Sequence, residues 1–269
     1  MNNRHDYRAE NLFSLGNEVV LVTGASGQLG NSIVNGLIDS KASVIAADID
    51  KESLNVSAER WRWNESKVVL APCDIRNRHD ITGALDRGIN AYGTVNALVA
   101  NAGVSVFEPY LERPEESIDR VMDINLKGTL LCMQEFVKHR KEHEGGGSIV
   151  NIGSHYGVTS PDPRIYTDCD RKNSEIYGAT KAGIIQMTKY FAVHAAEYEI
   201  RTNAVSPGGI RNPDNPQGDD FQKNYGQRCP MGRMSETHEI IGAVLFLLSP
   251  AASYINGQNI VIDGGTTCW

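Results

Sequence analysis

Short, continuous apolar runs alternate with longer amphipathic stretches along almost the whole chain, and no other feature restricts its fold so strongly. The run Ile149-Val150-Asn151-Ile152 is largely apolar without alternation, which is typical of strands covered on both faces. Strands are predicted near residues 19–23, 42–48, 67–72, 96–100, 148–153, 201–205 and 259–262. Helices are predicted near residues 29–40, 51–62, 80–92, 115–143, 174–197 and 237–248. Such repeated strand–helix units predict an α/β fold with a doubly wound parallel sheet.

The 269 residues are predicted to form one domain. The chain is 41% hydrophobic and 22% charged, which is sufficient for a substantial core. No Pro/Ser-rich linker or internal repeat divides it, so residues 1–11 are predicted to be an N-terminal extension and residues 12–269 a single domain. Two stretches interrupt the rhythm: a polar insert at residues 155–173 and a Gly/Pro/Asn/Asp-rich loop at residues 207–230. Loops of this length in a compact domain are often functional.

Charge and hydropathy exclude several classes of partner. A formal net charge of −7 argues against nucleic acid, which requires a basic surface, and against docking on anionic lipid. The longest clean apolar run, residues 240–248, is far shorter than the ~20 residues that span a membrane. The first residues, MNNRHDYRAENLF, contain no apolar signal-peptide core. A cytoplasmic protein without a membrane or nucleic-acid partner is therefore expected.

Cysteine and histidine spacing gives no sign of a metal. The five cysteines are odd in number, and none lies in a CxxC pair, so neither a disulfide framework nor a zinc site is expected. The seven histidines show no HExxH or HxH spacing. No metal ligands are predicted.

A glycine-rich turn, TGASGQLG at residues 23–30, joins the first predicted strand to the first predicted helix. Glycines at such a junction let the backbone approach a pyrophosphate, while the helix N-terminus supplies free N–H groups. Many glycine-rich loops are plain turns, but the place of this one in a repeating strand–helix chain favours a dinucleotide site. The residues predicted to contact the cofactor here are Gly24, Ser26, Gly27, Gln28, Leu29 and Gly30.

Asp48 closes the second predicted strand, eighteen residues after Gly30. A carboxylate at about this offset accepts hydrogen bonds from the adenosine ribose hydroxyls and repels a 2′-phosphate. The nearest following basic residue, Lys51, has Asp50 beside it. NAD is therefore predicted in preference to NADP, the alternative being that Asp48 is only a turn residue.

Tyr177 and Lys181 are four residues apart on one predicted helix, so their side chains share a face. An ammonium beside a phenol favours the phenolate, which predicts a pKa for Tyr177 below its ordinary value of about 10. Such a tyrosine is a usable general acid and base. Ser154 closes the fifth predicted strand, at the edge of the sheet where ligands bind in doubly wound folds. An exposed helix pair is the alternative interpretation of Tyr177 and Lys181.

Further motifs complete a pattern that covers nearly the whole chain after about residue 12. They are Asp74 after the third strand, Asn-Ala-Gly at residues 101–103, Asn125 in the long helix, Asn-Ala-Val-Ser-Pro-Gly at residues 203–208 and Asp-Gly-Gly at residues 263–265. With the glycine-rich turn and the Tyr177–Lys181 pair, they resemble the compact, single-domain short-chain dehydrogenases/reductases. The resemblance implies a Rossmann-like, seven-stranded parallel sheet in the order 3-2-1-4-5-6-7. It also implies an oxidoreductase that acts on a CH–OH group with NAD(P).

The resemblance implies a role for each matching residue. Tyr177 would exchange a proton with the reacting oxygen, and Ser154 would hydrogen-bond that oxygen. Lys181 would lower the pKa of Tyr177 and hold the nicotinamide ribose, while Asn125 would hold a water that relays protons. The other expected cofactor contacts are Asp74, Ile75, Asn101, Gly103, Pro207, Gly208 and Ile210.

The chain departs from the family pattern in two places near the predicted site. The compact type usually has glycine where this chain has Gln28, and the glycine at position 27 gives a spacing typical of the extended, sugar-nucleotide-modifying branch. Ser154 and Tyr177 are twenty-three residues apart, where the family usually has about a dozen. The extra residues are the insert, which is predicted to cover the substrate pocket.

The charged insert favours a polar small-molecule substrate, such as a sugar derivative, because a steroid or long acyl chain selects an apolar pocket. Segments around Tyr156 and Pro207 also resemble family members linked to bacterial flagellin or surface-glycan modification. A role in surface-glycan biosynthesis is the resulting hypothesis. A solvated surface loop is the alternative interpretation of the insert.

Three alternative functions are compatible with these motifs. An NADPH-dependent 3-ketoacyl-type reductase shares the catalytic residues, although Asp48 and the insert disfavour it. An NAD-retaining sugar-nucleotide epimerase or dehydratase fits the spacing of Gly27. A non-catalytic dinucleotide-binding regulator would keep the fold without turnover, which the intact Ser154, Tyr177 and Lys181 disfavour.

Small residues at positions 178, 179, 182 and 183 give the Tyr177 helix a face that permits close packing. Packing within the chain is one interpretation. The family resemblance implies instead a homodimer or homotetramer, in which this helix pairs with a second subunit. Trp269 is then predicted to lie at a subunit contact.

Overall fold

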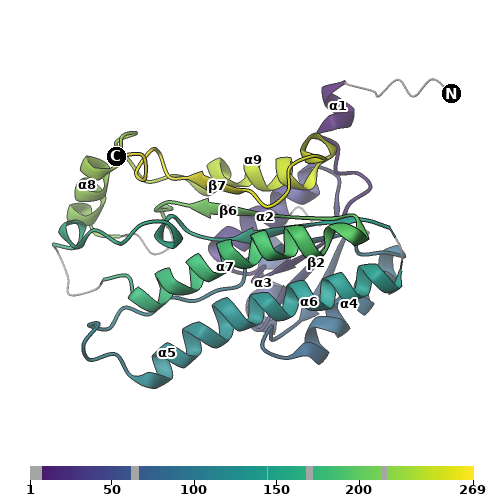
Figure 1. The fold of residues 1–269 in the computed structure, drawn as a ribbon, viewed down its shortest axis with the longest axis horizontal. Coiled ribbons are helices and arrows are strands. Elements are labelled where there is room, and N and C mark those ends of the chain that lie inside the picture. The colour runs from purple at the N-terminus through teal and green to yellow at the C-terminus, as the bar shows by residue number, and fades with distance from the viewer. Residues whose placement is uncertain (1–7, 62–66, 144, 168–171, 214–216) are drawn as a thin grey trace.

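The computed structural model describes residues 8–61, 67–143, 145–167, 172–213 and 217–269, which form a seven-stranded sheet with helices on both faces (Figure 1). The neighbouring strands are all parallel, in the order β3-β2-β1-β4-β5-β6-β7. This confirms the predicted Rossmann-like, doubly wound fold. The strands are β1 (Val19–Thr23), β2 (Ser43–Asp48), β3 (Val68–Pro72), β4 (Ala97–Ala100), β5 (Gly147–Ile152), β6 (Ile200–Pro207) and β7 (Asn259–Ile262).

The helices connect the strands and lie close to their predicted positions, with two exceptions given below. The α-helices are α1 (Ala9–Leu12), α2 (Gln28–Asp39), α3 (Lys51–Arg60), α4 (Arg78–Tyr92), α5 (Glu115–Val121), α6 (Thr129–Glu142), α7 (Glu175–His194), α8 (Asp219–Arg228) and α9 (Thr237–Leu248). The other helices are the π-helix η1 (Met122–Gly128) and the 3₁₀ helices η2 (His155–Gly157), η3 (Pro163–Ile165), η4 (Ala196–Tyr198) and η5 (Pro250–Ala252). Among the described residues, no helix combines the length and apolarity that crossing a membrane requires.

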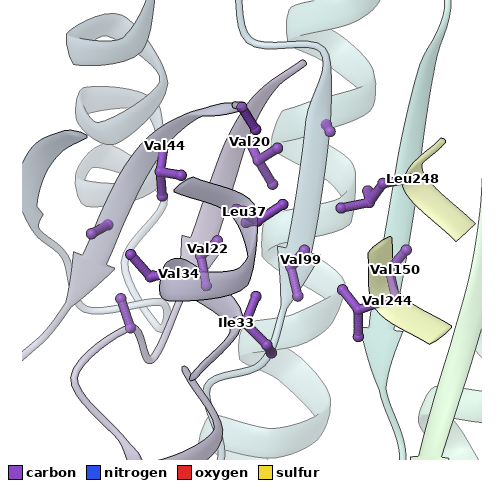
Figure 2. Close-up of a cluster of buried hydrophobic side chains, with 14 of the residues drawn as sticks. Val20, Val22, Ile33, Val34, Leu37, Val44, Val99, Val150, Val244 and Leu248 are labelled. Atoms are coloured by element: carbon purple, nitrogen blue, oxygen red, sulfur yellow. The ribbon is translucent and has the colours of Figure 1, made fainter. Parts of the chain in front are cut away.

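Both faces of the sheet are buried, which explains the continuous apolar runs in the sequence. Because successive side chains of a strand point to opposite faces, Val20 and Val22 pack with α2 and α9 in one cluster (Figure 2). Leu21, between them, packs in a second cluster with α4 and α6. All three valine and leucine side chains are at most 1% exposed, so β1 is buried on both faces.

The long helix predicted over residues 115–143 contains a π-helical segment. α5 and α6 flank η1, which has the wider i→i+5 winding. The apolar periodicity of this stretch predicts a helix but does not reveal the local change in winding. This segment carries Asn125.

Part of the predicted loop at residues 207–230 is helical. α8 forms because its side chains Phe221 and Tyr225 are buried with Ile165 and Tyr166 of the insert. The Tyr166 and Phe221 rings lie 5.3 Å apart. The interpretation of the insert as a wholly polar segment is therefore wrong, because its middle part supplies an apolar anchor for α8. Residues 168–171 and 214–216 lie outside the described residues.

Polar contacts join the same two segments at the surface. Asp162 of the insert pairs with Arg228 at the end of α8 at 2.7 Å, and Asn224 donates to the Thr167 hydroxyl at 2.8 Å. Trp269 donates from its indole to the Arg228 carbonyl at 3.3 Å and is 79% exposed. The insert, α8 and the last residue thus form one packed unit at the edge of the domain.

Candidate active site

The carboxyl ends of β1 to β6 meet at one edge of the sheet and open onto a cleft of about 570 Å³. Ser154 and all residues predicted to contact the cofactor line it: Gly24, Ser26, Gly27, Gln28, Leu29, Gly30, Asp48, Asp74, Ile75, Asn101, Gly103, Tyr177, Lys181, Pro207, Gly208 and Ile210. Lining residues absent from the prediction are Ile49, Cys73, Arg76, Ala102, Val104, Ser105, Ile124, Ile152 and Gly153. Most of them are adjacent in sequence to motif residues, and this adjacency is the sequence signal that could have identified them.

Two glycines of the first turn are required by its geometry. Gly24 has a φ of +65°, and a Cβ there would lie 2.7 Å from the Cα of Ala102. A Cβ on Gly30 would lie 2.0 Å from the Gly24 carbonyl oxygen. At Gly27 the nearest atom would be 3.4 Å away, so this glycine is not required by packing.

Gly27 is the N-cap of α2, and no side chain caps it. The first N–H groups of a helix lack partners within the helix and carry its positive dipole end. No acidic residue lies in the first turn of α2. The turn can therefore accept a pyrophosphate, which needs N–H donors without a competing carboxylate.

Asp48 joins the end of β2 to the glycine-rich turn. Its Oδ2 accepts from the Ser26 N–H at 3.0 Å and from the Ser26 hydroxyl at 2.6 Å. Its Oδ1 accepts from the Asp50 N–H at 3.2 Å. The carboxylate is thus held at the cleft wall with Oδ1 only weakly engaged, where a ribose hydroxyl can donate to it.

Asp74 faces the cleft but its carboxylate is already engaged. Arg76 donates from Nε and Nη2 to it, with contacts of 2.6 to 3.0 Å. These hydrogen bonds lower the pKa of Asp74 below its ordinary value. Arg76, which the sequence prediction missed, therefore brings a guanidinium to the adenine side of the cleft.

Ser154, Tyr177 and Lys181 meet at one end of the cleft. The Ser154 hydroxyl oxygen accepts from the Tyr156 N–H at 3.1 Å, and the hydroxyl is hydrogen-bonded to Tyr177. Lys181 donates from Nζ to the Ile152 carbonyl at 2.8 Å. Its Nζ lies 5.6 Å from the centroid of the Tyr177 ring. A hydroxyl pair and an ammonium are therefore assembled at one point, as the sequence predicts.

Burial controls the protonation of Tyr177 and Lys181. It raises the pKa of Tyr177, and the hydrogen bond from Ser154 opposes this without overcoming it. Burial lowers the pKa of Lys181 to about 8. The prediction of a lowered pKa for Tyr177 is therefore wrong for the protein chain alone, because removal from water disfavours the phenolate more than the Ser154 hydrogen bond favours it.

Asn125 lies behind the cleft, in η1, and is fully buried. Its amide oxygen accepts from the Val104 N–H at 2.8 Å, and its amide nitrogen donates to the Val104 carbonyl at 2.9 Å. A Cβ on Gly103 would lie 3.3 Å from Asn125 Oδ1 and 3.6 Å from Lys181 Nζ. Gly103 therefore keeps the space between these two polar groups open.

The insert is linked to the cleft wall through its last residue, Asn173. None of its described residues lines the cleft, so the prediction that it covers the pocket does not hold for this part of the chain. The contact is indirect: Ser105, which lines the cleft, donates to the Asn173 amide oxygen at 3.1 Å. Gln28 makes a similar link to the other predicted loop by donating to the Arg211 carbonyl at 2.6 Å.

The described residues contain no group of three or more His, Cys, Asp or Glu side chains arranged to hold a metal ion.

Comparison with known sequences agrees with this geometry. Residues 24–267 match the family model described as enoyl-(acyl carrier protein) reductase. The chain is 34% identical over 249 residues to a 3-oxoacyl-[acyl-carrier-protein] reductase FabG of Thermotoga maritima, covering 92% of this chain and 97% of the relative. It is 31% identical over 261 residues to an NAD-dependent glycerol dehydrogenase of Listeria innocua, covering 95% and 96% of the two chains.

Solved structures give the same result. A short-chain dehydrogenase from Leptospira borgpetersenii with bound NAD⁺ is 38% identical and superposes with a TM-score of 0.85, covering 97% of this chain and 96% of that one. The chain therefore belongs to the short-chain dehydrogenase/reductase family, as an oxidoreductase that acts on alcohol and ketone groups.

Proposed function

We propose that this protein is an NAD(H)-dependent oxidoreductase that interconverts a secondary alcohol and a ketone on a small polar substrate. The observation that carries the proposal is a single cleft with the Asp48 carboxylate at one wall and Ser154, Tyr177 and Lys181 together at the other end. The Asp48 carboxylate suits a ribose, and the group of Ser154, Tyr177 and Lys181 suits proton transfer to an oxygen.

The cleft fits a dinucleotide. The uncapped N-terminus of α2 would hold the pyrophosphate, and Gly24 and Gly30 provide the close approach. Asp48 Oδ1 would accept from the adenosine ribose, and its charge would repel a 2′-phosphate. Arg76 is the feature that could favour NADP, but Asp74 already holds its guanidinium. These contacts support NAD in preference to NADP.

When bound, NAD⁺ would supply the hydride acceptor, and its positive charge would favour the phenolate form of Tyr177. Tyr177 takes the proton of the substrate hydroxyl during oxidation and returns one during reduction. Ser154, whose oxygen is held by the Tyr156 N–H, donates to the reacting oxygen. Lys181 supplies the positive charge beside the phenol. Asn125 would hold a water in the space that Gly103 leaves open between Asn125 and Lys181.

The cleft and the relatives support a polar substrate class. The hydroxyl groups of Ser105 and Ser154 line the cleft, which favours a polyol or sugar derivative; surface-glycan biosynthesis is one setting for such a substrate. The glycerol dehydrogenase relative supports a polyol. The FabG relative favours the second candidate, a 3-ketoacyl reductase with NADPH.

The experiment measures NADH formation at 340 nm with a panel of polyols and sugar derivatives, beside NADPH oxidation with acetoacetyl thioesters. Turnover of at least one polyol with NAD⁺, lost in Tyr177→Phe, supports the proposal. Turnover of the thioester alone, with NADPH, would replace it by the second candidate. A tightly retained nucleotide without net NADH formation would indicate the epimerase or dehydratase alternative.

We also propose that the protein is a homo-oligomer that pairs through the outer face of α7. Tyr190 and Val193 on this face are 59% and 72% exposed. Gly183, by contrast, packs within the chain, since a Cβ there would lie 2.6 Å from Leu126. Light scattering on the full chain and on a variant that lacks Trp269 tests both contacts. A monomeric mass for the full chain would contradict the proposal. If the variant that lacks Trp269 has the same oligomeric mass as the full chain, Trp269 does not contribute to the subunit contact.

A further inference from the structure

Arg113, Glu108 and Glu175 form an ion cluster, and none of the three has a role in the proposed reaction. Arg113, whose side chain is 2% exposed, donates from Nη1 to Glu108 at 2.6 Å and from Nε to Glu175 at 2.9 Å. Its Nη2 donates to the Glu108 carbonyl at 2.8 Å and to the second Glu175 oxygen at 3.2 Å. The remaining Glu108 oxygen accepts from Ser117 at 2.8 Å. The guanidinium thus binds two separate segments at once.

The two segments meet at the start of the catalytic helix. Glu175 is the first residue of α7, and Tyr177 is two residues further on. The Tyr177 N–H donates to the hydroxyl of the N-cap, Ser174, at 3.2 Å. Arg113 therefore acts on the turn of helix that carries the Tyr177 side chain.

Glu108 and Arg113 belong to the connection between β4 and α5, and the start of that connection forms the cleft wall. Val104 and Ser105 line the cleft. A second link parallels the ion cluster, because Ser105 donates to Asn173, whose amide oxygen also accepts from the Ser174 N–H at 2.9 Å. The wall of the cleft and the beginning of α7 are thus joined at two points.

The solvent exposure of the cluster indicates a role beyond stability. The side chains of Glu108 and Glu175 are 39% and 55% exposed, whereas that of Arg113 is 2% exposed. Desolvating a guanidinium largely offsets the gain from its ion pairs, so a buried Arg is weak evidence for stabilisation. Its planar fork, however, fixes the relative position of two carboxylates in a way that an apolar side chain cannot.

We propose that Arg113 is a positioning residue for the reaction, acting through Glu175 to set the place of the Tyr177 hydroxyl relative to the cleft wall at Ser105. The inference rests on the proposed function for its kinetic consequence. Its structural consequence, a change in the surroundings of Tyr177, does not depend on any substrate.

The test compares Arg113→Met, Arg113→Lys and Glu175→Gln with a matched control, Arg78→Met. Arg78 pairs with Glu135 and Gln134 between α4 and α6 and does not line the cleft. The substrate-free readout is the ¹³Cζ NMR signal of Tyr177 in tyrosine-labelled protein at neutral pH, assigned with Tyr177→Phe. Calorimetric NAD⁺ binding and steady-state kinetics with glycerol complete the set.

In Arg113→Met the Tyr177 signal is expected to shift or broaden, and kcat to fall about 10- to 100-fold, since small misplacements of a catalytic group cost this much. NAD⁺ affinity should stay within about threefold, because positioning acts after binding. Arg113→Lys keeps the charge but not the fork and should recover part of kcat. Glu175→Gln should show the same signature more weakly, and Arg78→Met should show none of it.

A folded Arg113→Met with an unchanged Tyr177 signal and a kcat equal to that of Arg78→Met would overturn the inference. If Arg113→Met does not fold, Arg113→Lys and Glu175→Gln decide by the same criteria, because Glu175 is largely exposed. If the wild type turns over no substrate, the proposed function fails, while the Tyr177 signal still decides the role of Arg113.

Discussion

The carboxylate of Asp48 and the hydroxyl of Ser26 are joined at 2.6 Å, so the end of β2 holds the glycine-rich turn directly. The same Oδ2 also accepts from the Ser26 N–H. Asp48 therefore does two things at once: it fixes the turn through Oδ2, and it presents a negative charge with a weakly engaged Oδ1 to the cleft. The two effects can be separated by mutation.

Asp48→Asn is expected to lower the preference for NAD⁺ over NADP⁺ by about tenfold or more, because it removes the charge that repels a 2′-phosphate, and about 1.4 kcal/mol corresponds to tenfold. Ser26→Ala is the matched control. It weakens the hold on the turn and should reduce the affinity for both nucleotides to a similar degree. Calorimetric Kd values for both nucleotides check this, and an unaltered ratio in Asp48→Asn would mean that the ribose is held elsewhere.

Gly30→Ala and Gly27→Ala should differ sharply. The Cβ of alanine at position 30 would lie 2.0 Å from the Gly24 carbonyl oxygen, whereas at position 27 its nearest neighbour is 3.4 Å away. Overpacking of this kind costs about 1–3 kcal/mol, so Gly30→Ala should lower the free energy of unfolding and the NAD⁺ affinity. Gly27→Ala should be nearly neutral in urea denaturation. Equal losses in the two variants would contradict the geometry of the turn.

Tyr177→Phe should reduce kcat by at least about 10² to 10⁴, the usual contribution of a general acid or base. The ring remains, and only the hydroxyl that meets Ser154 is lost, so NAD⁺ affinity should change by less than about threefold. Turnover and calorimetry on the same preparation measure both quantities. Substantial residual turnover would remove Tyr177 from its assigned role.

Lys181 makes stability depend on pH in a defined window. Its pKa is lowered from 10.5 to about 8 in the folded protein because it is buried. Between these values the unfolded chain binds more protons than the folded one, so the free energy of unfolding rises with pH. The rise is at most about 3 kcal/mol, since one pKa unit corresponds to about 1.4 kcal/mol.

Lys181→Met lacks this titration. Urea denaturation of both proteins at several pH values from 7 to 10.5 should therefore show wild type gaining stability relative to the variant above about pH 8, with a constant difference below it. A difference that stays constant over the whole range would show that Lys181 titrates normally in the fold.

Much of the fold follows from local patterns. Strands such as β1 and β4 were predictable because they are short runs that are apolar on both faces. Asp48 and Ser154 were predictable as cleft residues because the carboxyl ends of parallel strands share one edge of the sheet. The π-helical winding around Asn125 was not predictable, because the stretch as a whole is typical of a helix and no local residue pattern marks the change to i→i+5 hydrogen bonding.

Features that depend on distant parts of the chain could not be predicted. α8 forms in a Gly- and Pro-rich segment because Phe221 packs on Tyr166 of the insert, fifty-five residues earlier. The raised pKa of Tyr177 depends on burial by several elements, which the four-residue spacing from Lys181 does not contain. The Arg113–Glu175 pair is sixty-two residues apart in sequence and has no local signal.

The central claim is that this cleft binds NAD(H) at Asp48 for oxidoreductase chemistry, and the most direct measurement is a calorimetric titration of the purified protein with NAD⁺ and with NADP⁺ under identical conditions. The account predicts a Kd for NAD⁺ at least about tenfold below that for NADP⁺, the preference expected of a carboxylate beside the ribose. Tighter binding of NADP⁺ would contradict the assignment of Asp48 and would favour the 3-ketoacyl-type reductase.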